Sequence, residues 1–176
     1  SSNNKVVITY QDSGNSSYGT AIVGTVSGTS ISFGSAVVFE AATSSFMYPI
    51  FDSNSNKVAI AYRDSGNSNY GAVIVGTVSD TSISFGSPAV VENGNSFYIS
   101  ATSDSSNNKV VIAYTDISNS YYGTSVVFQN ASTNLTSENY IGMSRGVTEI
   151  TSSETGTAVT YDASETAYQA ATFDST

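Results

Sequence analysis

One stretch of sequence occurs three times in this chain, and the repeat constrains the fold more than any other feature. The copies begin at Lys5, Lys57 and Lys109, so that successive copies are 52 residues apart. A fixed period of this length is typical of proteins built from stacked supersecondary units. The sequence therefore predicts a single repeat domain over residues 1–176, with repeats at 1–52, 53–104 and 105–176.

Each repeat opens with the pattern of a buried strand. In the second repeat, Ile60 and Tyr62 alternate with Ala59 and Ala61, which is the two-residue period of a strand. The side chains at both sets of positions are apolar or small, which indicates that both faces of the strand are buried. We expect a sheet that lies between two similar sheets, with bulky side chains of one sheet against small side chains of the next.

Three further strands are expected in each repeat. In the second repeat a polar turn at 64–67 follows the first strand, since Asp, Asn and Gly favour tight turns. A second strand at 70–78, a third at 83–91 and a fourth at 98–104 that closes the unit complete the pattern. In the third repeat the fourth strand is expected at 168–174. The predicted fold is all-β, with three repeats of a four-stranded antiparallel unit.

The third repeat departs from this spacing. The glycine that opens its third-strand motif is Gly156 and not position 138, so 18 residues are inserted near 130–155. Loops longer than about 12 residues are often functional or interaction segments. A surface hairpin without a function is the alternative.

Composition excludes several partners and chemistries. The formal net charge is −9 with only five Lys and Arg residues, so the phosphate backbone of a nucleic acid is not an expected partner. The absence of cysteine and histidine removes thiol nucleophiles, imidazole bases and the commonest zinc ligands. No apolar run approaches the roughly 18 residues of a spanning helix, so membrane insertion is not expected.

The repeated aspartates are candidate metal ligands. Asp12, Asp64 and Asp116 are each followed three positions later by asparagine. Calcium accepts carboxylate and amide oxygens, which makes calcium binding the alternative for these turns. Capping of the turn backbone by the Asp side chain explains the same spacing, and a calcium loop normally brings more carboxylates. We predict a structural role, with no metal and no cofactor.

The tyrosines after the polar turns are candidate ligand contacts. Tyr18, Tyr70 and Tyr122 follow the three turns, and Tyr121 and Asn119 lie beside the third of them. A tyrosine ring can pack on a sugar while its hydroxyl group forms hydrogen bonds. These five residues are the predicted carbohydrate-binding residues. Packing between the repeats is the alternative role for the tyrosines.

One segment resembles a known family motif. Asp80 stands five residues before Phe85, with Ser82 and Ser84 between them. This segment resembles the Ser-x-Asp-x-Gly-x-Thr-Trp turn of sialidase-type, or BNR-repeat, β-propeller blades, although Gly28 replaces the Asp in the first repeat. The resemblance implies β-propeller blades, while a β-prism and a β-trefoil also use three four-stranded units. Three blades are few for a closed ring, so self-association into a homo-oligomer is expected.

The amino-acid sequence of the repeats also resembles a second group of proteins. The repeats and the segment 134–142 are similar to repetitive β-rich regions of phage tail-fibre and marine viral proteins. The resemblance implies a protein of a virion, or an extracellular or cell-surface protein, that attaches to a host glycan or receptor. The alternative is a purely structural protein that self-assembles into a fibre, filament or shell.

Catalysis is not expected. Sialidase chemistry uses a cluster of arginines to hold the substrate carboxylate, and the chain has only Arg63 and Arg145. Arg63 is not a repeated residue, because the other two repeats have Gln11 and Thr115 at its place. Serine is abundant, but without histidine its usual general base is missing. The sequence therefore predicts a binding or structural protein and not an enzyme.

Overall fold

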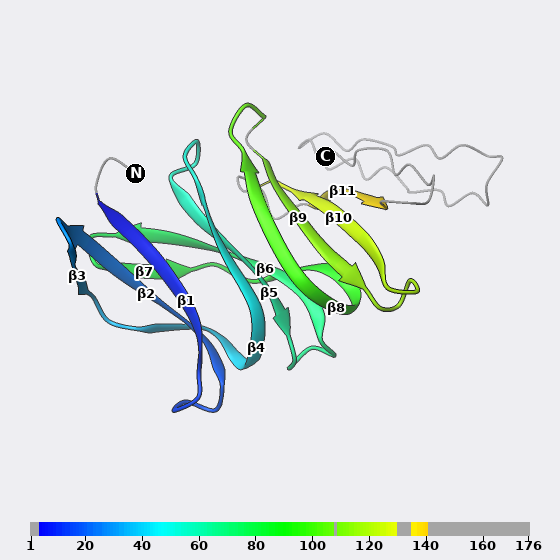
Figure 1. The fold of residues 1–176 in the computed structure, drawn as a ribbon, viewed down its shortest axis with the longest axis horizontal. Helices are drawn as coiled ribbons and strands as arrows, with labels where there is room; N and C mark the ends of the chain where they lie inside the picture. Colours follow the sequence, from blue (N-terminus) through cyan, green and yellow to red (C-terminus); the bar gives the residue numbers. More distant parts are fainter. Residues whose placement is uncertain (1–3, 108, 130–134, 141–176) are drawn as a thin grey trace, which may run out of the picture.

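The computed structural model describes residues 4–107, 109–129 and 135–140, and these residues form strands and turns without a helix. Figure 1 shows the strands in three groups that follow one another along the long axis of the molecule, in the order of the sequence. The Val, Ile, Thr, Tyr and Phe residues that dominate these segments favour strands over helices. The prediction of an all-β fold is confirmed.

Eleven strands are present in the described part of the chain. They recur with the period of the sequence, because β1, β5 and β9 begin at Lys5, Lys57 and Lys109, 52 residues apart. The strands are β1 Lys5–Asp12, β2 Tyr18–Ser27, β3 Ser30–Phe33, β4 Val37–Asp52, β5 Lys57–Asp64, β6 Tyr70–Ser79, β7 Ser82–Phe85, β8 Ala89–Asp104, β9 Lys109–Asp116, β10 Tyr122–Phe128 and β11 Leu135–Tyr140.

The strands pair antiparallel in three sheets that share two long strands. In sheet A, β2 pairs with β1 on one side and with β3 and the first half of β4 on the other. Sheet B contains the second half of β4, then β5, β6, β7 and the first half of β8. Sheet C contains the second half of β8, then β9, β10 and β11. Because β4 and β8 belong to two sheets each, the strands form one 11-stranded array from β1 to β11.

Two expected strands differ from the structure. The third strand of the first two repeats is interrupted, so that β3 and β4 pair separately with opposite ends of β2, and β7 and β8 with opposite ends of β6. The expected fourth strand does not close its own repeat, since it is the second half of β4 or β8 and pairs with the first strand of the next repeat. The alternation of residues predicts a strand but does not show which strand it pairs with. Sheets B and C therefore each begin with the last strand of one sequence repeat and continue with strands of the next repeat.

Two predictions concern the last part of the chain. The predicted insertion near 130–155 lies outside the described residues except for β11, which pairs with β10. The predicted strand at 168–174 also lies outside the described residues.

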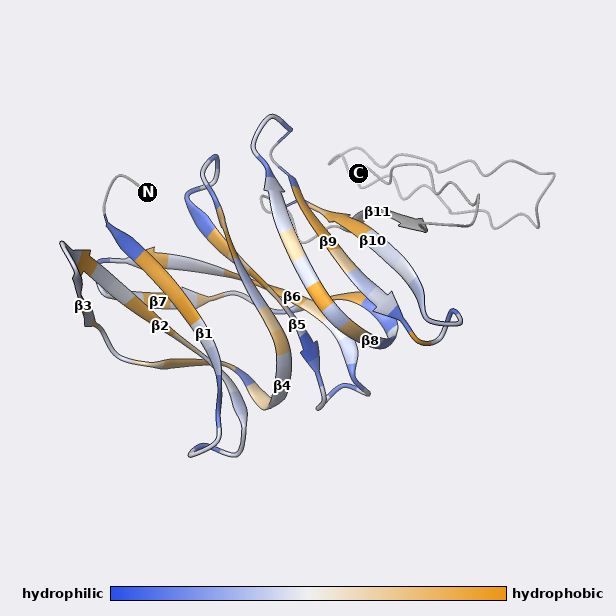
Figure 2. Cartoon of the chain, in the orientation of Figure 1, coloured by the Kyte–Doolittle hydropathy of each residue, from blue (hydrophilic) through white to orange (hydrophobic). Residues whose placement is uncertain are grey.

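One hydrophobic cluster joins sheets A and B. Sheet A contributes Ala21, Val23 and Phe39, which are at most 7% exposed. Sheet B places Ile60 and Tyr62 against them, both without exposed surface, and the rings of Phe39 and Tyr62 meet edge to face with centroids 5.2 Å apart. Figure 2 shows the hydrophobic residues along the middle of the strands and the hydrophilic residues at the turns. Burial of these side chains is the main force that holds the two sheets together.

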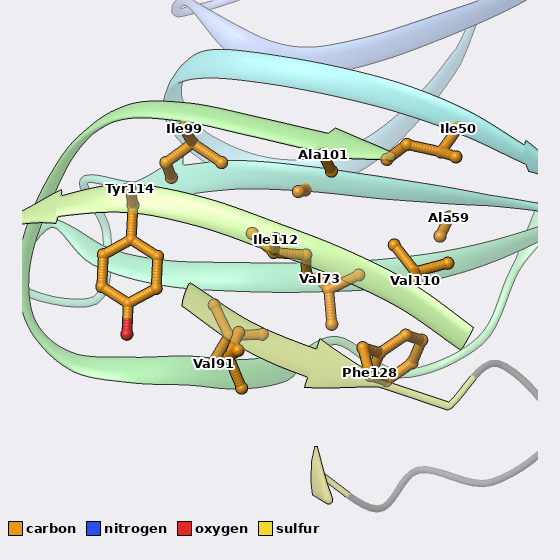
Figure 3. Packing of buried hydrophobic residues seen from close by; sticks show 12 residues of the cluster. Ile50, Ala59, Val73, Val91, Ile99, Ala101, Val110, Ile112, Tyr114 and Phe128 are labelled. Atoms are coloured by element: carbon orange, nitrogen blue, oxygen red, sulfur yellow. The ribbon is translucent and has the colours of Figure 1, made fainter. Parts of the chain in front are cut away.

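A second cluster joins sheets B and C (Figure 3). Sheet B presents the small residues Ala59 and Ala61, which have no exposed surface. Sheet C packs Val110, Ile112 and Tyr114 against them, each at most 3% exposed. Both faces of β5 are therefore buried, and bulky side chains lie against small ones, as the alternation in the sequence predicts.

A tyrosine hydroxyl group crosses each interface to a glutamate. Tyr62 donates to Glu40 Oε2 over 2.9 Å, and Tyr114 donates to Glu92 Oε2 over 2.8 Å. Burial raises the pKa of Tyr62, and the nearby Glu40 carboxylate raises it further. Burial also raises the pKa of Glu40, while the hydrogen bond from Tyr62 acts in the opposite direction. The Tyr62 hydroxyl group therefore remains a donor at neutral pH.

We expect Tyr62→Phe to lower the free energy of unfolding by about 1 kcal/mol, because Glu40 loses its donor in a partly buried position. Tyr10→Phe is the matched control, since Tyr10 has the same place in sheet A, where no described sheet lies beyond it. Urea denaturation of both variants at pH 7 measures the difference. Equal losses in the two variants would contradict a stabilising role for the bond between the sheets.

Candidate binding site

The repeated aspartates of the polar turns bind their own backbone. Asp64 Oδ1 accepts the N–H groups of Gly66 over 2.8 Å and Asn67 over 3.2 Å, and Asp116 accepts that of Asn119 over 3.2 Å. These Asx turns account for the spacing of Asp and Asn without a ligand. The described residues contain no group of three or more His, Cys, Asp or Glu side chains that could hold a metal ion.

The aspartates at the other end of the sheets also cap turns. Asp104 accepts hydrogen bonds from the Asn107 side chain over 2.6 Å and from the Ser106 N–H group over 3.0 Å. The hydrogen bonds from the side chains of Asn107 and Ser106, that of Asn107 first, lower the pKa of Asp104 to about 2, and the backbone N–H groups of both residues act in the same direction. Asp52 binds the turn that follows it in the same way, while Asp174 lies outside the described residues. The described aspartates at both ends of the sheets therefore accept hydrogen bonds from their own turns.

The five predicted contact residues lie at one end of the sheets, in and after the turns that follow β1, β5 and β9. Tyr121 is 70% exposed and Tyr122 is 43% exposed. Tyr18 and Tyr70, the first residues of β2 and β6, are half-buried. Asn119 is also half-buried, and its backbone carbonyl accepts the Tyr122 N–H group over 3.0 Å. Among the predicted tyrosines, those of the third turn thus offer the most surface to a ligand.

A second group of aromatic side chains lies where β4 and β8 pass from one sheet to the next. Phe46 of β4 meets Phe97 and Tyr98 of β8 with ring centroids 5.6 Å apart in both pairs. Tyr98 is 73% exposed, more than any other large hydrophobic side chain in the described part of the chain. The pairing register of both strands shifts at this point, and such bulges redirect side chains at the end of a sheet.

The pairing registers place both aromatic groups at the same end of sheet C. Ser96 and Tyr122 lie opposite Asp116, on the two sides of β9. Because neighbouring strands are about 4.8 Å apart, these two backbones are about 10 Å apart. In Figure 1 the turn between β9 and β10 and the bend of β8 both lie at the lower end of sheet C. We define the aromatic rim as Phe46, Phe97, Tyr98, Tyr121 and Tyr122.

Arg63 brings a positive charge to the aromatic rim. Its guanidinium carbon lies 4.2 Å from the centroid of the Phe97 ring, which is within the range of a cation–π interaction. The buried Nε of Arg63 and the Oγ of Ser45, the residue opposite it in β4, have no hydrogen-bond partner among the described residues. Most buried polar groups in proteins are paired. The Arg63 Nε and the Ser45 Oγ are exceptions to this rule.

Three residues of the aromatic rim have an unfavourable backbone conformation. The φ angles of Phe46, Tyr98 and Tyr121 are 50°, 51° and 62°. Positive φ is uncommon for bulky residues and costs about 1–2 kcal/mol per residue. At the place of Tyr121 the other repeats have Ser17 and Asn69, and asparagine tolerates this conformation better. Backbone strain of this kind clusters at functional sites.

Of the residues of the aromatic rim, the sequence predicts Tyr121 and Tyr122 as ligand contacts but not Phe46, Phe97 and Tyr98. It also does not predict that Arg63 lies beside them. A signal was present, because Phe46 and Tyr98 are 52 residues apart and both are aromatic. The alternation of residues predicts a regular strand at both positions, because a β-bulge cannot be recognised from that alternation. Arg63 stands at a repeated position that is uncharged in the other repeats. Since the repeats share one fold, an arginine that occurs in only one of them is not required by that fold.

A hollow of about 310 Å³ lies away from the aromatic rim, at the start of β1 and the end of β4. Much of its lining is apolar and includes Val6, Pro49, Phe51 and Val58. The first strands of sheets B and C have β4 and β8 beside them, whereas β1 has no such neighbour within the described residues. The hollow is therefore the gap at the open edge of sheet A and not a second candidate site.

Comparisons with protein-family models, with curated proteins and with solved structures found no match. The described residues contain no helix that is long and apolar enough to cross a membrane.

Proposed function

We propose that this chain is a non-enzymatic attachment protein of a virion or another extracellular structure, and that it binds a surface glycan or receptor through the aromatic rim. The observation that carries this proposal is the exposure of two strained aromatic residues, Tyr98 at 73% and Tyr121 at 70%. A fold selected only for stability gains nothing from bulky residues at positive φ. Contact of these rings with a ligand explains why the chain keeps bulky residues in a strained conformation.

The chemistry of the aromatic rim suits a saccharide that carries an anionic group. Tyrosine rings offer an apolar face to the C–H groups of a sugar, and their hydroxyl groups bond its oxygens. Arg63 adds a guanidinium group, which pairs with carboxylates in a bidentate manner. In a chain with a formal net charge of −9, this positive charge among aromatic rings favours an acidic sugar over a neutral one.

The sheet geometry supports a description of the three sheets as propeller blades. The turn with Asp80, at φ 52°, joins β6 to β7, and Gly28, at φ 58°, lies in the matching turn of sheet A. When sheet B is counted from the second half of β4, the Asp80 turn joins its third strand to its fourth. The motif that this segment resembles occupies that place in a sialidase-type blade. In this proposal further blades must complete a ring, because three are too few.

A glycan array followed by titration tests the attachment role. We expect the chain to bind a subset of acidic glycans and Tyr98→Ala to weaken this binding at least about tenfold, as for a central aromatic contact. Tyr121→Asn is expected to weaken binding without loss of stability, because Asn69 has nearly the same φ, 64° against 62°. Phe51→Ala is the matched control, since Phe51 is 44% exposed and lies at the opposite end of the strands.

The outcomes separate the parts of this proposal. If the chain binds neither neutral nor acidic glycans on the array, glycan attachment is ruled out. Binding that survives both rim substitutions would place the site elsewhere. A loss in Arg63→Gln that is confined to acidic glycans would identify the guanidinium contact.

A structural role in a fibre, filament or shell is the second candidate function. It is favoured by the apolar face of sheet A, where Ile8 is 40% and Phe33 is 52% exposed. Polymerisation of a chain that binds no glycan would support this role over attachment.

A further inference from the structure

Sheet A has an exposed apolar face at the end of the array. We define the outer face of sheet A by five residues and their exposed fractions: Val6 37%, Ile8 40%, Ile31 41%, Phe33 52% and Val38 39%. Figure 2 shows hydrophobic residues in β1 and β2, the strands at this end of the molecule. Contiguous apolar patches on soluble chains mark interaction surfaces.

The pairing registers place these residues on one face. Val6 and Phe33 both pair with Gly24, from its two sides. Ile8 and Ile31 stand two residues from Val6 and Phe33, so the alternation of side chains directs them to the same side. Val38 pairs with Thr20, an even number of residues from Gly24 along β2. The five side chains therefore form a single surface.

The equivalents of these residues in sheet B are covered by sheet A. Val58, Ile60 and Ile83 follow Val6, Ile8 and Ile31 by 52 residues. They are 5%, 0% and 4% exposed within the cluster that joins the two sheets. Sheet C repeats the arrangement against sheet B. The outer face of sheet A is thus the third copy of a surface that the chain already buries twice.

The complementary surface is repeated as well. Ala59 and Ala61 of sheet B receive the bulky side chains of sheet C. Their equivalents 52 residues later are Val111 and Ala113, which alternate with the buried residues of β9 and so lie on the face of sheet C that points away from sheet B. Ala113 is exposed and Val111 is half-buried. A second copy of the chain can therefore present the side that fits the outer face of sheet A.

We infer that copies of this chain associate head to tail. The outer face of sheet A in one copy packs on the face of sheet C that carries Val111 and Ala113 in the next copy. This contact continues the stacking of sheets across the boundary between chains. A contact between two different surfaces repeats, and it ends in a closed ring or an open fibre. The inference is independent of the aromatic rim, which lies at the ends of the strands and not on these faces.

Two variants that block opposite sides of the contact test the inference. We expect sedimentation velocity to give the unchanged chain a mass of at least twice 18.3 kDa, increasing with concentration. Phe33→Lys blocks the outer face of sheet A, Ala113→Arg blocks the receiving face of sheet C, and each variant alone is expected to be monomeric. A mixture of the two is expected to form a one-to-one heterodimer and nothing larger, because one intact pair of surfaces remains.

Controls exclude a loss of fold. Ile8→Lys blocks the outer face from a different strand and is expected to behave as Phe33→Lys does, also in the mixture. Tyr121→Asn alters the aromatic rim and is expected to leave the mass unchanged. Thermal unfolding of each variant near the temperature of the unchanged chain shows that the monomers are folded.

Two results would overturn the inference. A mass of 18.3 kDa for the unchanged chain at every concentration would mean that no second copy binds. A dimeric Ala113→Arg variant, with no new species in the mixture, would show a two-fold contact between outer faces instead. Glycan binding by the monomeric variants is measured separately, so that failure of one proposal does not decide the other.

Discussion

Replacement of Ile60 by alanine is expected to lower the free energy of unfolding by about 4 kcal/mol, whereas the same change at Ile8 is expected to cost less than about 1 kcal/mol. Ile60 has no exposed surface and is enclosed between sheets A and B. The smaller side chain loses apolar burial and leaves a cavity. Ile8 has the equivalent place in sheet A but is 40% exposed, so its truncation leaves no enclosed space.

Urea denaturation at low protein concentration measures both losses without a contribution from association. At high concentration the loss for Ile8→Ala is expected to increase, because the contact between copies stabilises the folded chain by mass action. A loss at Ile8 as large as that at Ile60 under dilute conditions would mean that the chain itself covers the outer face of sheet A. That result would contradict the inference that a second copy binds to the outer face of sheet A. It would not affect the proposal for the aromatic rim.

The burial of β5 on both faces follows directly from the sequence. Ile60 and Tyr62 alternate with Ala59 and Ala61, and a two-residue period assigns the two sets to opposite faces of a strand. The structure buries both sets, one against sheet A and the other against sheet C. This prediction succeeds because alternation is a local property of the chain.

The path of β4 and β8 does not follow from the sequence. The expected fourth strand pairs with the first strand of the next repeat, and the register of this pairing shifts near Phe46 and Tyr98. Such a bulge depends on contacts with strands far away in the sequence. The same limit applies to the site, since the approach of Arg63 to Phe97 joins residues 34 positions apart in two different strands. Tyr121 and Tyr122 follow a recognisable turn and can be predicted from local patterns, whereas Phe46 and Tyr98 are marked only by their spacing of 52 residues.

Gly34→Ala is expected to lower the free energy of unfolding by about 3 kcal/mol, because the new methyl group has no space. Gly34 lies in the break between β3 and β4, and a Cβ atom there would be 1.9 Å from the carbonyl oxygen of Thr81. Thr81 belongs to the turn between β6 and β7 of sheet B. A backbone carbonyl in a packed turn cannot move aside without a shift of one sheet relative to the other.

Gly86→Ala is the matched control for this substitution. Gly86 has the equivalent place in sheet B, and the nearest described atom to its Cβ would be the Val75 carbonyl oxygen at 3.9 Å, which is an ordinary contact. We expect a change within about 0.5 kcal/mol, as for substitutions that create no clash. If urea denaturation gave equal losses for the two variants, the backbone conformation of the break would be the cause. A large loss at Gly34 alone shows that this glycine lets sheets A and B approach closely enough to bury Ile60 and Tyr62.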